Sequence, residues 1–359
     1  MQKSKGGGIF LMNLSREIKC EFHPVYEHVQ STLEAVDASG GAMIIVHNDK
    51  IAAESYWGTY TQGAEAKPIQ EHSQFHVASV RKSYIALAAA YAVYHKFIIS
   101  IDDKVTDYLP ALSPDLFKNV TIRHLLTHTH GLKNMYGNIV REFPAGEGWA
   151  YRGIGVRLLT DIIQKATSKT ISEIVTELVF EPLHFKETGW YGGKEPNLVK
   201  VLRDHNDPFY YWSHSTDGDK VNMYVSAREL AYWGYLHLKE GFINGKQIVP
   251  KEMIKMATSL QSPPLANHDY PQHGFLWYAK GTSSPKLSEI GEMVPQGSYQ
   301  LLGYTGVALL VIPEQNLVAV RMTNRFGSPF GYNYLTDIRS FGDTILSCVH
   351  ELEMQALKQ

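Results

Sequence analysis

The chain has 359 residues, of which 44% are hydrophobic and 19% are charged, as expected for a globular protein with an ample core. Its formal net charge of −2 includes no basic excess, so neither a nucleic acid nor an anionic membrane is expected as a partner. The two cysteines, Cys20 and Cys348, are too few for a disulfide framework.

The N-terminal stretch MQKSKGGGIFLMN begins with basic residues, but its apolar run, IFLM, is too short for the central region of a signal peptide. No later run approaches the roughly 18 apolar residues of a membrane-spanning helix. We therefore expect residues 1–13 to be a tail, no transmembrane segment, and a cytoplasmic protein.

The first elements expected along the chain are a helix and a hairpin. Residues 14–37 carry apolar side chains at helical spacing, with an interruption at Pro24. Residues 41–58, GAMIIVHNDKIAAESYWG, predict a β-hairpin that turns at Asn48 and Asp49. Residues 75–94, FHVASVRKSYIALAAAYAVY, then predict a short extended stretch leading into a long apolar helix.

The middle of the chain differs from its ends. Residues 101–270 are mostly helical patterns and loops, for example at 157–179 and 226–241. Residues 305–324, TGVALLVIPEQNLVAVRMTN, predict a second hairpin, and residues 334–357 predict a closing helix.

Hairpins flanked by helices at both chain ends indicate an α+β fold. The economical arrangement is an antiparallel sheet built from both ends, flanked by N- and C-terminal helices, with a mainly helical lobe inserted. We assign residues 14–100 and 271–359 to a discontinuous α/β lobe and residues 101–270 to the helical lobe. The two lobes would form one catalytic unit with a cleft between them.

Ser79 and Lys82 lie where the extended stretch meets the apolar helix. Positions i and i+3 share a helix face, so the lysine amine can reach the serine hydroxyl. A free lysine, with a pKa of about 10.4, is a poor base at neutral pH, but apolar neighbours and Arg81 would lower that pKa. The pair is a candidate nucleophile and base, with helix N-terminal N–H groups available to an oxyanion. The alternative is that Ser79 is an ordinary N-cap.

The same spacing recurs at Ser283 and Lys286, in a polar turn that contains Pro285. No apolar helix follows this second copy. The sequence context therefore favours Ser79 and Lys82 over Ser283 and Lys286 as the nucleophile and base, although the spacing alone does not distinguish the two pairs.

Two further features of the sequence are candidate partners for Ser79 and Lys82. Tyr151 follows a loop rich in proline and glycine and precedes a helix, where a phenol beside a cation could move a proton. A lone tyrosine there is more often an amphipathic residue with a buried ring. Gly303 and Gly306 bracket the start of a strand, where close backbone approach could supply an oxyanion donor, or could simply form a turn.

Three histidines, His124, His128 and His130, lie close together in RHLLTHTH. Histidines at i and i+4 can bind zinc, but no carboxylate pattern accompanies this set. A structural role is the favoured interpretation, and we expect neither a metal nor a cofactor.

Together these features resemble the serine β-lactamase and penicillin-binding-protein superfamily, and most closely its branch of class C β-lactamases, D,D-peptidases and family VIII esterases. The resemblance covers nearly the whole chain. FHVASVRKS resembles the first motif of this superfamily, LLTHTHGL the helix before the active-site loop, AYRGIGVRLLTDII the tyrosine motif and GYTG the third motif. It implies the β-lactamase/transpeptidase-like form of the fold described above.

The resemblance also implies the roles of individual residues. Ser79 becomes the acylated nucleophile, Lys82 its base, and Tyr151 the general acid/base that protonates the leaving group and later helps to activate water. The oxyanion hole would be formed by the backbone N–H groups of Ser79 and Val307. The residues implied in substrate binding are Arg152, Tyr304, Thr305 and Gly306.

The chain departs from the branch at two positions. Tyr151-Arg152-Gly153 stands where relatives have Tyr-x-Asn, and Tyr304 stands where they have Lys or His before Thr-Gly. A lysine there helps to bind the carboxylate of β-lactams and of peptides ending in D-Ala, and a phenol cannot supply that charge. Arg152 could compensate for it.

We therefore expect a serine hydrolase that cleaves a small ester, amide or peptide through an acyl-enzyme. The first alternative is a penicillin-binding D,D-peptidase or β-lactamase, and the second is a non-catalytic binding module of the same fold. The sequence leaves the substrate and the oligomeric state open.

Overall fold

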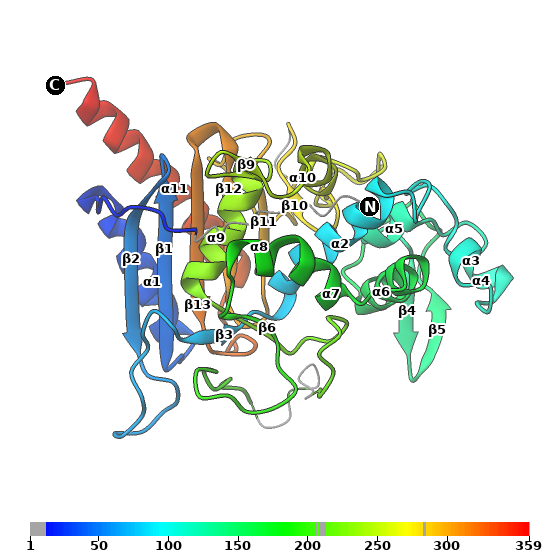
Figure 1. Cartoon of the computed structure of the whole chain (residues 1–359), viewed down its shortest axis with the longest axis horizontal. Coiled ribbons are helices and arrows are strands. Elements are labelled where there is room, and N and C mark those ends of the chain that lie inside the picture. Colours follow the sequence, from blue (N-terminus) through cyan, green and yellow to red (C-terminus); the bar gives the residue numbers. More distant parts are fainter. Residues whose placement is uncertain (1–11, 205–206, 208–212, 283–284, 359) are drawn as a thin grey trace, which may run out of the picture.

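The computed structural model describes residues 12–204, 207, 213–282 and 285–358. At its centre is a six-stranded antiparallel sheet in the order β10-β11-β12-β13-β1-β2 (Figure 1). Strands from the two chain ends meet within it because β1 pairs with β13. The predicted α+β fold, with a sheet built from both ends of the chain, is confirmed. The strands of this sheet are β1 (Gly40–His47), β2 (Lys50–Gly58), β10 (Tyr278–Ala279), β11 (Tyr299–Leu302), β12 (Ala308–Ile312) and β13 (Leu317–Thr323).

Both predicted hairpins are present in this sheet. Strands β1 and β2 join through Asn48 and Asp49, whose φ angles of 50° and 66° are in the left-handed region that these two residue types tolerate. Strands β12 and β13 join through the short turn η4 (Pro313–Gln315) and Asn316, whose φ is 45°. The turn residues therefore set the hairpin positions that the sequence predicts.

The sheet is covered on both faces because its side chains alternate. Met43 and Ile45 of β1 belong to a hydrophobic cluster with α1 (His23–Ala35) and α11 (Tyr334–Ala356). Ile44 belongs to a second, larger cluster that includes α9 (Ala227–Leu238). The sheet thus separates the two terminal helices from the rest of the helical structure.

The N-terminal helix begins later than the sequence pattern predicts. Residues before it run alongside β2, with the Glu17 N–H donating to the Ile51 carbonyl, and Ile18 is 61% exposed. A short turn, η1 (Cys20–Phe22), leads into α1, and Pro24 lies in the first turn of that helix. Proline is favourable there because the first N–H groups of a helix have no partner within it. Pro24 therefore starts this helix, and the predicted interruption is wrong.

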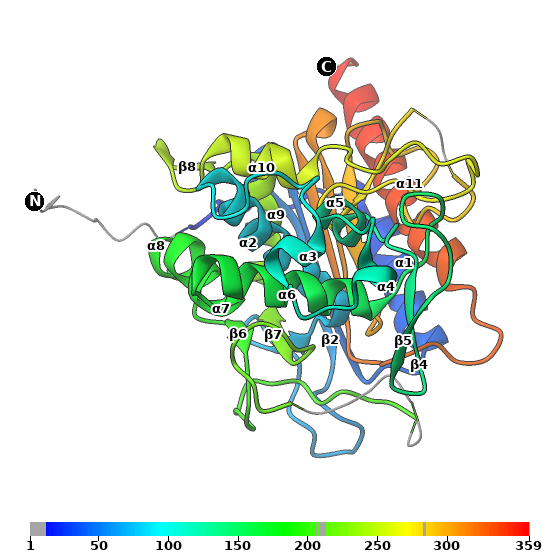
Figure 2. The same cartoon turned by 90° about the vertical axis from the view of Figure 1, so that its right-hand side faces the viewer.

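The middle of the chain supplies most of the remaining helices, which gather on one side of the sheet (Figure 2). Helix α2 (Lys82–Tyr94) is almost entirely buried and packs against α6, α7 and α10. Its alanine-rich sequence suits close contact on every side. The other elements are η2 (Ala78–Arg81), α3 (Val105–Tyr108), α4 (Pro114–Phe117), α5 (Ile122–Leu126), α6 (Gly153–Thr167), α7 (Ile171–Val175), the π-helical turn η3 (Thr176–Phe180), α8 (Glu181–Leu183) and α10 (Lys251–Thr258).

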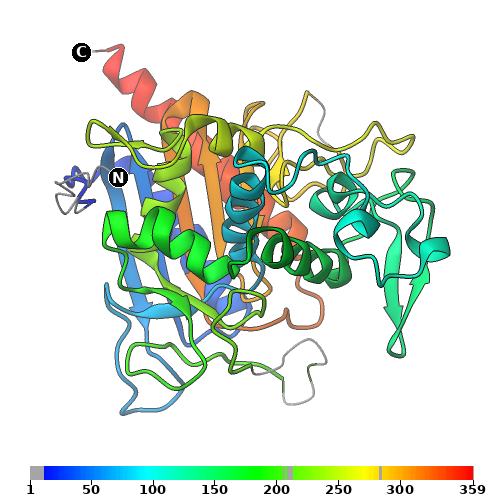
Figure 3. The ribbon, with the colours of Figure 1, turned by 45° about the vertical axis from the view of Figure 1, so that its right-hand side comes forward.

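Three small sheets complete the fold. Strands β3, β7 and β6 form one of them, and the hairpins β4–β5 and β8–β9 form the others. The β4–β5 hairpin projects away from the central sheet (Figure 3). The strands are β3 (Gln74–His76), β4 (Leu132–Met135), β5 (Asn138–Arg141), β6 (Thr188–Trp190), β7 (Met223–Ser226), β8 (Phe242–Ile243) and β9 (Lys246–Gln247).

The predicted division into lobes at residues 100 and 271 stays a prediction, and contacts cross it in both directions. Helix α2, from the first segment, packs among the helices, whereas α9, from the middle segment, packs against strands β1, β12 and β13. In the part of the chain that is described, no helix is long and apolar enough to cross a membrane. The predicted tail lies mostly outside the described residues.

Candidate active site

Ser79 lies in a tight connection between a strand and a buried helix. Strand β3 ends at His76, and the turn η2 leads directly into α2. Ala78 has a φ of 45°, a conformation that residues with a side chain rarely adopt. No side-chain capping hydrogen bond is formed at the start of η2 or of α2. The alternative that Ser79 is an ordinary N-cap is therefore not what the structure contains.

Lys82 links the serine to a tyrosine from a distant part of the chain. Its Nζ lies 2.7 Å from the Ser79 Oγ and 2.6 Å from the Tyr151 Oη. The lysine is 5% exposed, so the ends of all three side chains meet at a buried amine. The structure thus brings together the nucleophile, base and acid/base candidates of the sequence analysis.

The charge state of Lys82 follows from its surroundings. Burial holds the pKa of Lys82 well below its usual value, and Arg81 lowers it further, whereas Glu289 opposes the shift. Burial and Arg81 are the two causes expected from the sequence. A neutral amine has a lone pair and can accept the serine proton, which an ammonium group cannot do.

Tyr151 stays protonated at neutral pH. The residue as a whole is 37% exposed, but its hydroxyl faces Lys82, and burial raises the pKa of the phenol. The Ser79 hydroxyl partly offsets this increase. Tyr151 can therefore hold a proton for donation while Lys82 remains able to accept one.

Two buried histidines pack in sequence behind the Tyr151 ring: His128 contacts Tyr151, and His273 contacts His128. The ring centroid of His128 lies 4.5 Å from that of Tyr151 and 5.3 Å from that of His273. Trp149 Nε1 donates to His273 Nε2 at 2.9 Å, and the Ala150 N–H donates to the His128 carbonyl at 3.0 Å. Burial lowers the pKa of both histidines, that of His273 to about 3, so this support is uncharged. The sequence analysis missed His273 and assigned His128 no part in the site.

The GYTG turn packs directly against the nucleophile segment. A Cβ on Gly303 would lie 2.4 Å from the Val77 carbonyl oxygen, so only glycine permits this approach. The Thr305 hydroxyl donates to the His76 carbonyl at 2.7 Å. The turn is therefore fastened to the same strand and turn that carry Ser79.

The same turn presents a backbone donor. Gly306 has a φ of 76°, and the Val307 carbonyl accepts from the Gly303 N–H at 2.7 Å. Within the described ranges, no backbone carbonyl accepts the Val307 N–H. This free donor suits an oxyanion, and the assignment of Ser79 and Val307 to an oxyanion hole stays a prediction.

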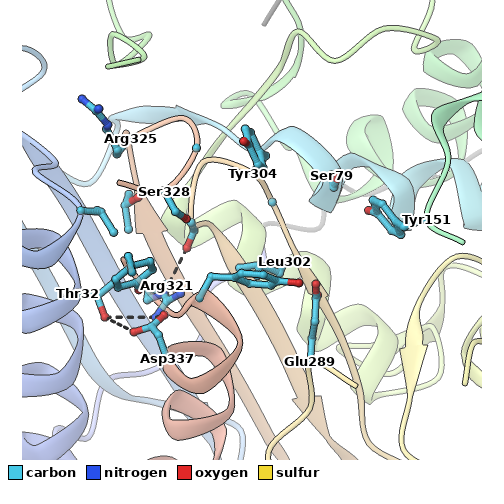
Figure 4. Close-up of a pocket in the computed structure, with 17 residues that line it drawn as sticks. Thr32, Ser79, Tyr151, Glu289, Leu302, Tyr304, Arg321, Arg325, Ser328 and Asp337 are labelled. Atoms are coloured by element: carbon cyan, nitrogen blue, oxygen red, sulfur yellow. Dashed lines mark hydrogen bonds and ion pairs between the residues drawn. The ribbon is translucent and has the colours of Figure 1, made fainter. Parts of the chain in front are cut away.

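Two cavities meet at Ser79, Tyr151 and Tyr304. One, of about 250 Å³, also contains Glu289 (Figure 4). The other, of about 640 Å³, also contains Arg152. A substrate whose reacting carbonyl lies at Ser79 can therefore extend in two directions.

The four predicted substrate-binding residues differ in whether they line a cavity and whether their polar groups are already engaged by the protein. Tyr304 is 46% exposed and lines both cavities, and Gly306 lines the smaller one. Thr305 is buried, and its hydroxyl is engaged by the backbone as described above. Arg152 lines the larger cavity, but its guanidinium pairs with Glu142 at 2.6 and 3.0 Å. Its charge is thus balanced within the protein, and a compensating role toward a substrate carboxylate stays a prediction.

The nearby histidines are held by the protein itself. His124 Nδ1 accepts from the Thr121 N–H at 3.1 Å, and His130 Nδ1 accepts from the Leu132 N–H at 3.0 Å. Across the described residues, no three His, Cys, Asp or Glu side chains gather as a metal site. In the second serine–lysine copy, Ser283 lies outside the described residues, and Lys286 pairs with Asp269 at 3.4 Å.

Glu289 is a residue of the site that the sequence analysis missed. It lies in the segment between β10 and β11, outside every motif, and no spacing signals it. Burial raises the pKa of its carboxyl to about 8, against the opposing effect of Lys82. Only the packing of this segment beside the cavity reveals it.

Comparison with known proteins places this fold and geometry in a family. A profile of the beta-lactamase family matches residues 27–340 of the chain. The chain therefore belongs to the beta-lactamase family, within the superfamily of serine β-lactamases and penicillin-binding proteins. The resemblance of the motifs is confirmed.

The relatives range from close to remote. An uncharacterised protein of Alkalihalophilus pseudofirmus is 56% identical over 94% of this chain and 99% of its own length. Esterase EstB of Burkholderia gladioli is 27% identical over 46% of this chain and 50% of its own. The structure of a penicillin-binding-protein homologue from Caulobacter crescentus superposes with a TM-score of 0.73 at 15% identity, over 94% of this chain and 100% of that one. This last similarity confirms the β-lactamase/transpeptidase-like fold.

Proposed function

We propose that the protein hydrolyses a small ester or amide through a covalent acyl-enzyme on Ser79. The observation that carries the proposal is the position of one buried amine, Lys82 Nζ, within 2.7 Å of a serine oxygen and 2.6 Å of a tyrosine oxygen. A serine hydroxyl is a weak nucleophile until an adjacent base takes its proton. Lys82 is placed to be that base.

Acylation follows from this arrangement. The neutral Lys82 amine takes the Ser79 proton as Oγ attacks the substrate carbonyl carbon, and the carbonyl oxygen becomes an oxyanion. The N–H groups of Ser79 and Val307 stabilise that charge. Tyr151 then donates its proton to the leaving group as the carbon–oxygen or carbon–nitrogen bond breaks. The proton held by Lys82 passes to the tyrosine oxygen over their short contact, which restores the phenol and the neutral amine.

Deacylation runs through the same groups in reverse. Tyr151 takes a proton from water while its own proton passes to Lys82, and the hydroxide attacks the acyl carbonyl carbon. As the acyl–Oγ bond breaks, Lys82 returns a proton to Ser79. The products are the free acid and the regenerated enzyme, with atoms and charge balanced.

Two differences from the branch favour an ester over a carboxylate-bearing β-lactam. Gly153 lacks the amide that relatives use toward a substrate, and Tyr304 lacks the cation that binds a carboxylate. The similarity to Esterase EstB supports the same choice, since that relative is named as an esterase.

The test is active-site labelling together with ester turnover. Wild-type protein should react with a fluorophosphonate probe and hydrolyse a 4-nitrophenyl ester of a short acid. Ser79→Ala should lose both reactions, because it removes the hydroxyl that lies 2.7 Å from the Lys82 amine. Equal labelling and turnover by Ser79→Ala would refute the proposal.

A second candidate function is that of a penicillin-binding peptidase or β-lactamase. It is favoured by the fold, which superposes on a penicillin-binding-protein homologue over 94% of this chain. A fluorescent penicillin should then label Ser79 in the wild type within minutes. Absence of that label alongside efficient ester turnover would exclude it, and steady turnover of any ester would exclude a purely non-catalytic role.

A further inference from the structure

Glu289 places an acidic group in the smaller cavity beside the proposed nucleophile. Its carboxyl group enters the space bounded by Ser79 and Tyr151 (Figure 4). Its Oε2 is buried and has no hydrogen-bond partner among the described residues. The backbone is held in place, since Gln300 Nε2 donates to the Glu289 carbonyl at 2.8 Å. The Tyr278 hydroxyl hydrogen-bonds the carboxyl group, which leaves Oε2 as its unpartnered oxygen, and such a buried oxygen is costly unless a ligand completes it.

The other charged groups of this cavity are already balanced. Arg321 pairs with Asp337 at 2.7 Å, and Arg325 pairs with Asp204. In the described part of the chain, Glu289 forms no ion pair within 4.0 Å. Lys82 acts on it electrostatically, but burial favours the neutral amine of that lysine. The cavity therefore holds one acidic group without a fixed counter-ion.

Aromatic rings line part of this space. Four tyrosines line it, one of them the Tyr151 of the proposed mechanism, and none carries a charge at neutral pH. Aromatic faces attract cations through their quadrupole, most strongly where water is excluded. The tyrosines are Tyr151, Tyr304, Tyr332 and Tyr334.

We propose that the smaller cavity receives a positively charged amine of the substrate, with the Glu289 carboxylate as its counter-ion and tyrosine rings around it. The proposal rests on the proposed function and defines its substrate class: esters or amides that carry an ammonium group on one side of the scissile bond. Glu289 is then a specificity residue rather than a participant in bond cleavage.

The raised pKa of Glu289 agrees with this role. Burial keeps the carboxyl largely protonated at neutral pH, since its pKa is about 8. An entering ammonium group would lower that pKa and ionise the carboxyl. The other groups that act on it are Lys82, Tyr278, Tyr151 and Tyr334, and burial raises the pKa of each of these phenols, which keeps them neutral.

Matched ester pairs test the proposal. Choline butanoate and 3,3-dimethylbutyl butanoate have the same shape and differ by one positive charge on the alcohol side. The 4-nitrophenyl esters of 4-(trimethylammonio)butanoic and 5,5-dimethylhexanoic acids make the same comparison on the acyl side. We expect wild-type kcat/KM to favour the charged ester of at least one pair by about 10-fold, as for a buried cation–aromatic site with a counter-ion. The pair that shows the preference identifies the side of the bond that enters the cavity.

Two variants assign the preference to Glu289. Glu289→Gln should lose the preference for the charged ester within each pair, because the amide keeps the shape of the side chain without its charge. Glu314→Gln, in the exposed turn between β12 and β13, removes one negative charge away from the cavity and should keep the preference. Equal rates within both pairs, or a preference retained by Glu289→Gln, would overturn the proposal.

A binding measurement separates this proposal from the hydrolase proposal. Calorimetry of the wild type should detect choline but not 3,3-dimethylbutanol, and choline binding should be lost in Glu289→Gln. If no ester in the panel is hydrolysed, the hydrolase proposal fails while choline binding still supports the cation site. If choline does not bind and no charge preference appears, the cation site is refuted whatever the esterase activity.

Discussion

Burial of the Lys82 amine has opposite effects on catalysis and on stability. A buried amine costs free energy when it is protonated, and the same burial makes it a base at neutral pH. Its neighbours Ser79 and Tyr151 satisfy the nitrogen in the neutral state, at 2.7 and 2.6 Å. Function and stability are therefore expected to respond to this residue in opposite directions.

The pH dependence of acylation tests the effect on catalysis. Because the pKa of Lys82 is well below its usual value, kcat/KM for an ester should rise with pH and reach its plateau well below the roughly 10.4 of a free lysine. Lys82→Arg keeps a cation that cannot lose its proton, and should lower kcat/KM by about 10²–10⁴-fold. A plateau reached only near the usual lysine pKa would contradict the neutral-base assignment.

Thermal unfolding tests the effect on stability. The folded-state pKa of Lys82 lies below its unfolded value, so between the two values the unfolded chain binds more protons and stability increases with pH. Lys82→Met removes this penalty and should raise the free energy of unfolding at neutral pH by about 1 kcal/mol, with the gain shrinking as the pH increases. A variant less stable than the wild type at neutral pH would show that the hydrogen bonds outweigh the desolvation cost.

At the scale of elements, the GYTG turn and the nucleophile turn depend on one glycine contact. Gly303→Ala places a methyl group 2.4 Å from the Val77 carbonyl, so one backbone must move, at a cost of about 1–3 kcal/mol. We expect a lower melting temperature together with reduced ester turnover, because Val77 leads directly to Ser79. Gly153→Ala is the matched control: its new methyl group has no atom within 4 Å, and its melting temperature should stay at or above that of the wild type.

The open space beside Gly153 also allows a test of why β-lactams are expected to be poor substrates. A Cβ added at Gly153 meets no atom within 4 Å, which favours an asparagine there, and Tyr304→Lys would restore the cation that relatives place before Thr-Gly. The double variant Gly153→Asn with Tyr304→Lys should label with fluorescent penicillin at least about 10-fold faster than the wild type, since it regains an amide and a carboxylate-binding charge. Labelling is followed by gel fluorescence with Ser79→Ala as the blank, and an unchanged rate would show that the β-lactam preference depends on other parts of the cavity.

At the scale of the whole molecule, the hairpins and the closing helix were predictable because each is encoded in a local pattern. Alternating apolar residues and turn formers define β1–β2 and β12–β13 before any tertiary contact is known. The start of α1 and the position of α9 against the sheet were not predictable in the same way. Both depend on which segments lie nearby: Ile18 runs beside β2 instead of joining a helix, and Gly234 allows α9 to approach Val318 of β13.

The cytoplasmic location stays a prediction, and the oligomeric state stays open.

The active site was predictable from the sequence in part. Sequence alone determined that Ser79 and Lys82 can touch, because residues three apart share a face in a 3-10 turn and in an α-helix alike, and here η2 leads directly into α2. It also determined the family, through motifs that recur in order.

The chemistry open to those residues depends on the tertiary structure. The pKa of Lys82 depends on burial by segments far from it in sequence, and Tyr151 reaches it across 69 positions of the chain. Glu289 enters the cavity from a segment without any motif. Desolvation and charge coupling act through space, so their sources cannot be read from neighbours along the chain.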